Sequence, residues 1–224
     1  MDIHKLSDLK EKYLENSFEK YSFEKNFGFD IKPYTSVVHF EPDDIILQEG
    51  DAPKRLYYMF NGRAKLYMTQ RNGSITVINF LQSPCFIGEM EMFDKNRQTH
   101  GVVALSTCEC FCIDLAECRD KLMSDVIFLQ HMCRSLSNKA LEDVSVFSKN
   151  QAYPLKVKLA AFILMTENNG LYRERHTEAS GYLGVTYRHL LYVLAEFVKD
   201  GILEKGAAGY RILDRRRLEE LADR

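Results

Sequence analysis

Residues 177–203, TEASGYLGVTYRHLLYVLAEFVKDGIL, constrain the fold more than any other segment of the chain. Ala179 and Leu183 are apolar at helical spacing, and residues 190–198 repeat that spacing in a second, longer series. Gly184 separates the two series, and glycine tolerates the left-handed backbone that a tight turn requires. The pattern predicts two short helices that meet at a sharp turn.

The second of these helices leaves polar and aromatic side chains on its exposed N-terminal part. Thr186 is a suitable N-cap, because its hydroxyl can accept a hydrogen bond from an unpaired backbone N–H of the first turn. The side chains expected to face away from the apolar side are Tyr187, Arg188, His189 and Tyr192. A helix that presents such residues is suited to the major groove of DNA. The plainer alternative is an ordinary helical hairpin with a solvated polar face.

The residues that follow favour the DNA-binding alternative. Residues 202–204 and 210–213 have the pattern of two short strands, and a glycine-rich turn at residues 206–209 joins them. A helix pair followed by a small hairpin is the winged helix-turn-helix pattern. Lys205 and Arg211 flank this wing, where DNA phosphates would lie.

Composition limits the classes of protein that remain. The chain has 224 residues, and its contents of 46% hydrophobic and 28% charged residues are ordinary for a globular protein. It has no apolar run that could span a membrane and no signal-peptide core, so we expect a cytoplasmic protein without membrane contact. Six cysteines in such a protein are expected to be reduced thiols. No nucleophile–base pair, phosphate loop or paired-carboxylate motif stands out, which argues against an enzyme.

The charge of the chain gives only weak support to DNA binding. The net charge is −2, but residues 154–224 hold 12 Lys and Arg against 10 Asp and Glu. The excess of positive charge therefore falls in the expected DNA-binding part, although it is small. Affinity for DNA would have to depend on the local placement of Arg and Lys.

In the residues that precede the helix-turn-helix, the spacing of apolar residues changes along the chain. Residues 4–27 have helical spacing, and the following region alternates with a period of two between turn signals. The expected strands are residues 37–40, 44–47, 56–60, 64–69, 74–80, 99–105 and 107–113. Many short antiparallel strands at this spacing predict a small barrel or jelly roll.

A single long helix is expected over residues 115–149. Three- and four-residue steps place a stripe of apolar and small residues on one side of it: Cys133, Leu136, Ala140, Val144 and Phe147. A stripe of this length favours a coiled-coil dimer, and packing against the roll is the plainer alternative.

The break at Tyr153-Pro154 ends this helix and completes the predicted organisation. We expect an α+β chain of three parts. Residues 1–114 form an N-terminal helix and a β-roll domain, residues 115–150 a dimerisation helix, and residues 151–224 a winged helix-turn-helix domain.

This order of parts resembles the CRP/FNR family of bacterial transcription regulators over nearly the whole chain. The motifs that carry the resemblance are IILQEGD at residues 45–51, LYYMFNGRAKLY at 56–67, FIGEMEMF at 86–93 and YLGVTYRHLLYVLAEFVKDGIL at 182–203. The last motif further resembles the YeiL-like branch. The resemblance implies a homodimer that binds a two-fold-related site on double-stranded DNA, with the roll as a sensor and RNA polymerase as a partner if the protein is an activator.

The resemblance also argues against cyclic AMP as the effector. The family's cyclic-nucleotide binders carry a phosphate cassette that begins Gly-Glu and ends Arg-Ser-Ala, and Gly88-Glu89 matches its start. Without a gap, the Arg and Ser positions fall on Thr99 and His100, and Arg97 stands two positions early. The charge-assisted contact to the cyclic phosphate is therefore not reproduced at its usual position.

The same comparison predicts an unusual DNA sequence. Family members commonly place Arg and then Glu in the first turn of the second helix, where Tyr187 and Arg188 stand here, and a later Arg falls on Tyr192. The half-site is therefore expected to differ from the usual family sequence.

The cysteines leave an alternative open. Cys108, Cys110 and Cys112 alternate, so they should point to one face of one strand, and we favour a core-facing stripe. A redox or iron–sulfur-responsive regulator built on Cys85, Cys118 or Cys133 is the alternative, although no ligand spacing supports a cluster. The histidines likewise show no metal-ligand spacing. A third possibility, a nucleotide-binding module with a protein partner, is disfavoured by the helix-turn-helix.

Overall fold

The computed structural model describes residues 17–52, 54–94 and 99–223, apart from the side chains of residues 142, 143 and 145–151. Its contacts divide the chain into two compact units. The first consists of Met1–Ala64 and Leu81–Lys139, and the second of Lys65–Phe80 and Ala140–Arg224. No helix among the described residues combines the length and the apolar character that a membrane crossing would need.

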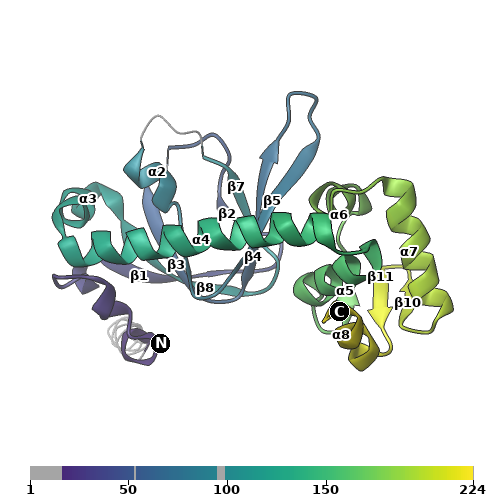
Figure 1. The fold of residues 1–224 in the computed structure, drawn as a ribbon. Helices are drawn as coiled ribbons and strands as arrows, with labels where there is room; N and C mark the ends of the chain where they lie inside the picture. The colour runs from purple at the N-terminus through teal and green to yellow at the C-terminus, as the bar shows by residue number, and fades with distance from the viewer. Residues whose placement is uncertain (1–16, 53, 95–98, 224) are drawn as a thin grey trace. The chain divides into compact units, whose positions relative to one another are not determined.

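Two four-stranded sheets form the roll that the alternating pattern predicts, and the fold class is α+β as expected (Figure 1). The first sheet has the order β1 (Thr35–Phe40), β8 (Cys108–Asp114), β3 (Arg55–Asn61) and β6 (Cys85–Ile87). The second has the order β2 (Ile45–Leu47), β7 (Gly101–Ala104), β4 (Arg63–Thr69) and β5 (Ile75–Gln82). Seven of these strands lie within a few residues of their predicted positions, whereas β6 and the short helix after it, α2 (Glu89–Phe93), were not predicted.

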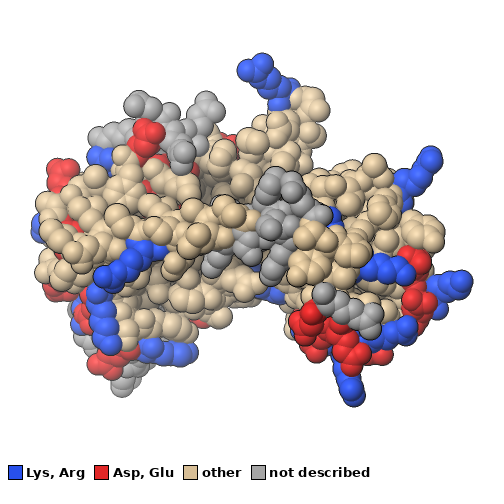
Figure 2. Space-filling model, in the orientation of Figure 1, with Lys and Arg blue, Asp and Glu red and all other residues tan. Residues whose placement is uncertain are grey.

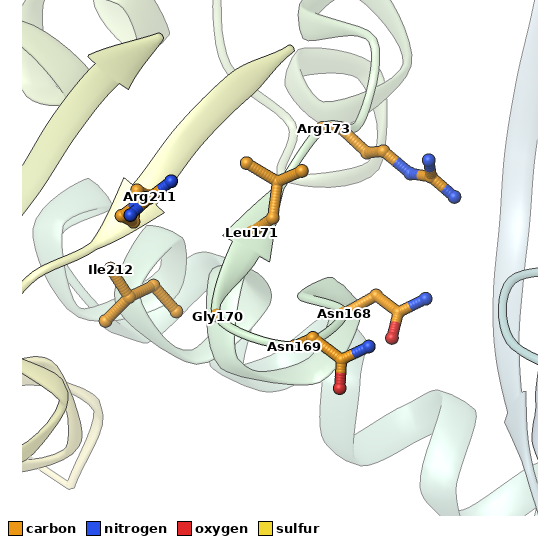
Figure 3. Close-up of a pocket in the computed structure, with 7 residues that line it drawn as sticks. All are labelled: Asn168, Asn169, Gly170, Leu171, Arg173, Arg211 and Ile212. Atoms are coloured by element: carbon orange, nitrogen blue, oxygen red, sulfur yellow. The ribbon is translucent and has the colours of Figure 1, made fainter.

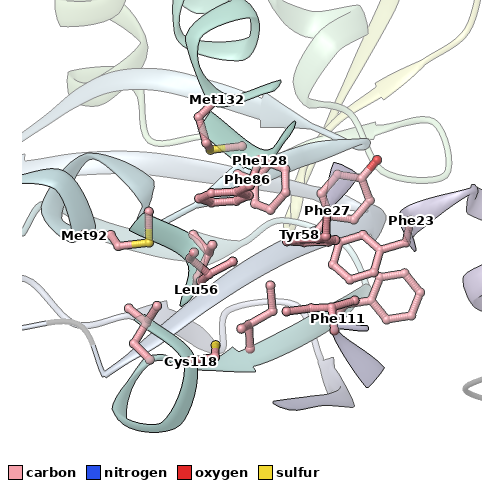
Figure 4. Close-up of a cluster of buried hydrophobic side chains, with 14 of the residues drawn as sticks. Phe23, Phe27, Leu56, Tyr58, Phe86, Met92, Phe111, Cys118, Phe128 and Met132 are labelled. Atoms are coloured by element: carbon pink, nitrogen blue, oxygen red, sulfur yellow. The ribbon is translucent and has the colours of Figure 1, made fainter. Parts of the chain in front are cut away.

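An aromatic core fills the first unit (Figure 4). Phe111 of β8 lies at its centre, with ring centroids 4.5 Å from Phe23 and 4.7 Å from Phe18. Aromatic side chains bury a large apolar area each and dominate the energy of such cores. The first unit therefore depends on side chains from both the roll and the segment before it.

The helix expected over residues 4–27 is wrong in its last turns, and its first part lies outside the described residues. The chain is helical at residues 17–21, and Ser22 then adopts a left-handed backbone with φ of 51°. A short 3₁₀ helix follows, η1 (Phe23–Asn26). The change of direction lets both Phe18 and Phe23 enter the aromatic core, where each is at most 1% exposed.

The single helix expected over residues 115–149 is also wrong, because Asp125 divides it. The two helices are α3 (Leu115–Ser124) and α4 (Val126–Ala152), and the backbone of Asp125 is extended between them. The Asp125 carboxylate accepts hydrogen bonds from the backbone N–H of Ile127 at 3.0 Å and of Gly28 at 2.7 Å. One side chain therefore caps the start of α4 and holds a distant segment beside it.

The helix α4 has two different faces. Phe128 and Met132 are at most 1% exposed and pack into the aromatic core, whereas Val144 is 65% exposed. On the expected stripe, Cys133 and Ala140 are also exposed, Leu136 is half-buried, and the Phe147 side chain lies outside the described residues. The early turns of α4 thus pack on the roll, while most of the described stripe stays uncovered in this chain.

The second unit contains the predicted break and the helix-turn-helix. Pro154 is the N-cap of α5 (Leu155–Thr166), as the break at Tyr153-Pro154 predicts. The elements that follow are β9 (Leu171–Tyr172), α6 (His176–Tyr182), α7 (Tyr187–Lys199), β10 (Leu203–Gly206), β11 (Gly209–Ile212) and α8 (Arg215–Ala222). The wing is a three-stranded sheet in the order β10-β11-β9, and the sequence analysis missed its third strand.

We expect Asp125→Ala to lower the free energy of unfolding by about 1–2 kcal/mol, because it removes the cap of α4 and leaves the Gly28 N–H without its acceptor. Urea unfolding measures the change. Asp120→Ala on the exposed side of α3 is the control. Equal unfolding midpoints for the parent and Asp125→Ala would show that the junction does not depend on this side chain.

Candidate nucleic-acid interface

The turn between α6 and α7 is built as the sequence predicts. Gly184 has a left-handed backbone with φ of 65°, and the Val185 N–H donates to the Ser180 carbonyl at 3.0 Å. Thr186 is the N-cap of α7, and its hydroxyl accepts from the His189 N–H at 3.3 Å. These contacts fix the direction in which α7 leaves the turn.

One face of α7 is buried and the other is open. Leu190, Val193, Leu194 and Phe197 are each at most 2% exposed. The predicted DNA-facing residues lie on the other side, with Tyr187 49% and Tyr192 63% exposed and Arg188 and His189 exposed as well. Burial of the apolar face holds the helix on its domain and leaves the first turn available to a partner.

The wing has the predicted hairpin and a strict requirement for glycine at its tip. Lys205 pairs with Tyr210 and Glu204 with Arg211 across β10 and β11, and both basic side chains are exposed. Gly209 has φ of 133°, and a Cβ atom there would stand 2.3 Å from the Tyr172 carbonyl oxygen. Only glycine fits this approach of the wing to β9.

A histidine that the sequence did not mark as a site residue joins α6, α7 and the wing. The His176 ring begins α6 and lies 6.3 Å from the Tyr187 ring of α7 and 5.7 Å from the Tyr210 ring of β11, between centroids. Burial, and then the nearby charge of Lys205, lower the pKa of His176. No spacing signal in the sequence marks this contact, because it depends on how the wing folds back.

Buried charges also hold α6. The Lys65 ammonium, which belongs to the same unit, lies 2.8 Å from a carboxylate oxygen of Glu178 and 3.1 Å from one of Glu174. Burial works against this positive charge, but the two carboxylates outweigh it and raise the pKa of Lys65. Lys65 therefore stays charged and compensates the two largely buried carboxylates.

A depression of about 640 Å³ lies beside the wing (Figure 3). It is lined by Asn168, Asn169, Gly170, Leu171, Arg173, Arg211 and Ile212, all of the second unit. In Figure 3 the side chains of Arg211 and Ile212 come from β11, and Arg173 points away from them.

Positive and negative side chains are mixed on the face that Figure 2 shows. Lys and Arg stand out around the end that carries α7 and the wing, but Asp and Glu lie among them. This agrees with the small net charge of that part of the chain. Any affinity for DNA therefore depends on individual side chains such as Arg188.

The predicted effector residues of the roll have partners within the chain. Gly88 adopts a left-handed backbone before α2, and the Glu89 carboxylate lies 2.5 Å from the Lys139 ammonium. Thr99 is buried, and its hydroxyl donates to the Asp51 carbonyl. His100 is half-buried, and Arg97 lies outside the described residues. The sequence analysis missed Lys139, which lies far from the cassette along the chain.

The three alternating cysteines belong to the core, as expected. Cys108, Cys110 and Cys112 are at most 5% exposed, and burial raises the pKa of each thiol. Burial likewise raises the pKa of Cys118 to about 11, and its thiol donates to the Asp114 carbonyl at 3.1 Å. Within the described part of the chain, no group of three or more Cys, His, Asp or Glu side chains is placed to hold a metal ion.

Comparison with known proteins identifies the architecture. Residues 37–125 match the cyclic nucleotide-binding domain, and residues 157–221 match the Crp-like helix-turn-helix domain. The regulatory protein YeiL of Escherichia coli O157:H7 is 43% identical over 90% of this chain and 92% of its own length. The chain belongs to the CRP/FNR family of transcription regulators.

Solved structures show the same fold. A CRP/FNR-family transcriptional regulator from Thermus thermophilus has a TM-score of 0.64 and 20% identity, over 84% of this chain and 99% of that one. The c-di-GMP-responsive regulator CLP of Xanthomonas campestris has a TM-score of 0.56 and 15% identity, over 81% and 95% of the two chains. At these identities the likeness concerns the fold alone. This CRP/FNR regulator therefore has the family's roll and helix-turn-helix, and its matches are to regulatory proteins.

Protonation of His176 should weaken the folded state. Unfolded histidine titrates near pH 6.5, whereas burial lowers the pKa of folded His176. As the pH falls below about 6.5, the unfolded chain takes up a proton that the folded chain resists, so stability is lost. We expect His176→Phe, which keeps a ring beside Tyr187 and Tyr210, to lose less stability than the parent between pH 7.5 and 5.5. Parallel losses in urea unfolding would contradict this.

Proposed function

We propose that this protein is a cytoplasmic, sequence-specific transcription regulator that binds a two-fold-related DNA site as a homodimer. The observation that carries the proposal is α7, whose apolar face is buried while Tyr187, Arg188 and His189 stand exposed at its first turn. The wing adds Lys205 and Arg211, both exposed. A recognition helix with flanking phosphate contacts is how such domains read DNA. RNA polymerase would be the further partner of an activator.

Arg188 is our candidate for reading a base. It is the second residue of α7 after the Thr186 cap, so its side chain leaves the first turn on the exposed side. A guanidinium there can donate two hydrogen bonds to O6 and N7 of one guanine. Contact with a phosphate alone is the competing role, because many such contacts only position the protein.

Arg188→Ala separates these two roles. Loss of a base reader should cost roughly 1–3 kcal/mol on the specific site and relax the preference at one base pair. Binding titrations on specific and scrambled duplexes at several salt concentrations measure both effects. Lys199→Ala, at the last turn of the same helix, is the control.

A uniform loss on all sequences, with a salt dependence flattened by about one unit, would assign Arg188 to a phosphate instead. Wild-type affinity for the specific site would remove Arg188 from the interface.

The dimer is assigned to the exposed stripe of α4. Cys133, Ala140 and Val144 lie at steps of seven and four residues and are exposed in the single chain. Seven-residue repeats of this kind bring equivalent positions of two parallel helices face to face. Val144, 65% exposed, would lose its contact with water in such a pair.

Cys133 offers a built-in probe of this dimer. It is the exposed cysteine of the chain, whereas Cys85 is half-buried and the other four are buried. If two α4 helices pair in parallel, copper-catalysed oxidation by oxygen should join the two Cys133 thiols in a disulfide, visible as a covalent dimer on a non-reducing gel. Cys133→Ser should abolish the product, and Val144→Glu should strongly reduce it, because the pair would bury an uncompensated charge. A monomeric Cys133→Ser variant in sedimentation, with no cross-link in the parent, would refute the dimer.

The effector of the roll is proposed to be something other than cyclic AMP. Glu89 and Thr99 are already engaged with Lys139 and with the Asp51 carbonyl, and the Arg position of the cassette holds Thr99. The c-di-GMP responsiveness of CLP concerns that protein. A redox-responsive regulator is the weaker alternative, since burial disfavours the thiolate that reacts in Cys108, Cys110, Cys112 and Cys118.

A further inference from the structure

We propose that the ion pair between Glu89 and Lys139 anchors α4 to the roll and thereby sets which face of α4 meets a second copy of the chain. Lys139 acts in this account as a positioning residue for the dimer. The inference rests on the proposed homodimer, and it adds a residue and a role that the dimer stripe itself does not contain.

The Lys139 ammonium has two acceptors, and the ion pair with Glu89 is largely buried. The Lys139 ammonium lies 2.5 Å from the Glu89 carboxylate and donates a second hydrogen bond to the Phe86 carbonyl at 2.9 Å. The Glu89 side chain is only 4% exposed and that of Lys139 is 21% exposed. A charge removed from water to this degree requires its partner, so the pair is held far more firmly than an exposed ion pair.

The elements that present these groups are rigid. Glu89 begins α2 directly after the left-handed turn at Gly88, and Phe86 lies on β6 with its ring in the aromatic core. The Phe86 ring also contacts Phe128 and His131 of α4, at 6.2 and 5.8 Å between centroids. The acceptors of Lys139 therefore belong to α2 and β6, and the Phe86 side chain of β6 lies beside Phe128 of α4 (Figure 4).

Lys139 continues the side of α4 that packs into the aromatic core. Phe128, Met132 and Lys139 follow one another at four and seven residues and thus share one side of the helix. Beyond Lys139, the next described side chains, Ala140, Leu141 and Val144, are all exposed. The first unit also ends at Lys139. Among the described residues of α4, Lys139 is thus the last one in the first unit, and its ion pair is a point at which that unit can fix the rotation of the helix.

The rotation matters because the two sides of α4 differ. Cys133, Ala140 and Val144 lie on a neighbouring side, Cys133 and Ala140 being about 100° around the helix from Met132 and Lys139, and they stay exposed. Apolar contacts alone permit some rotation of a helix about its axis. A hydrogen-bonded ion pair restricts that rotation, because its donor and acceptor have to meet at one angle. A side chain of α4 itself therefore occupies the Glu89 carboxylate of the cassette.

Four variants test the anchor: Lys139→Met, Glu89→Gln, the double variant with both changes, and Lys139→Arg. The dimer dissociation constant is measured by sedimentation at decreasing concentration, thermal stability by unfolding, and the order of α4 by backbone hydrogen exchange. Arg134→Met, an exposed residue on the same helix, is the control.

We expect each single neutral variant to lower stability and to weaken the dimer about tenfold or more, while Lys139→Arg and Arg134→Met stay near the parent. The double variant leaves no unpaired charge, so its stability should recover. Its dimer should remain weak, because the ion pair no longer fixes the rotation of α4. A double variant that recovers both properties would overturn the proposal and reduce the pair to a structural contact.

The result also separates this inference from the proposed dimer. If the parent is monomeric, the proposed homodimer is wrong. The ion pair then has no dimer whose contacting face of α4 it could determine. Parent-like dimerisation of Lys139→Met, with unchanged exchange around residues 136–140, would leave the homodimer intact and overturn the anchor alone.

Discussion

The helix α4 packs against the roll on one side and is exposed on another, and the rest of the structure depends on this arrangement. On one side it completes the aromatic core of the first unit with Phe128 and Met132. On the other side it leaves Cys133, Ala140 and Val144 uncovered. Asp125 fixes where the helix begins, and Lys139 joins it to α2 and β6 of the roll. In the proposed homodimer the same element would belong to a stable fold and also offer the surface for pairing.

The helix-turn-helix could be predicted from the sequence because the features that define it lie close together along the chain. A glycine turn, a threonine cap and an apolar repeat within residues 177–203 were enough to place α6 and α7, and the structure has each of them. The glycines of the wing likewise marked its hairpin. The exposure of Tyr187, Arg188 and His189 followed from the helical period alone.

The features that the sequence analysis missed depend on contacts between distant residues. The break at Asp125 is stabilised by the N–H of Gly28, 97 positions away, and Lys139 meets Glu89 across 50 positions. The strand β6 is only three residues long and has no alternating pattern to reveal it. His176 joins α7 to the wing only after the hairpin has folded back. No local propensity reports such pairings, because each side chain is ordinary in its own segment.

The central claim is that two copies present α7 symmetrically to DNA. The most direct measurement is the selection of bound duplexes from a random-sequence pool by the purified protein, followed by sequencing. The account predicts an inverted repeat whose half-sites are about 10 base pairs apart, centre to centre, since the two recognition helices of a dimer enter the major groove one helical turn apart. Enrichment of a single asymmetric half-site, or no enrichment at all, would contradict it.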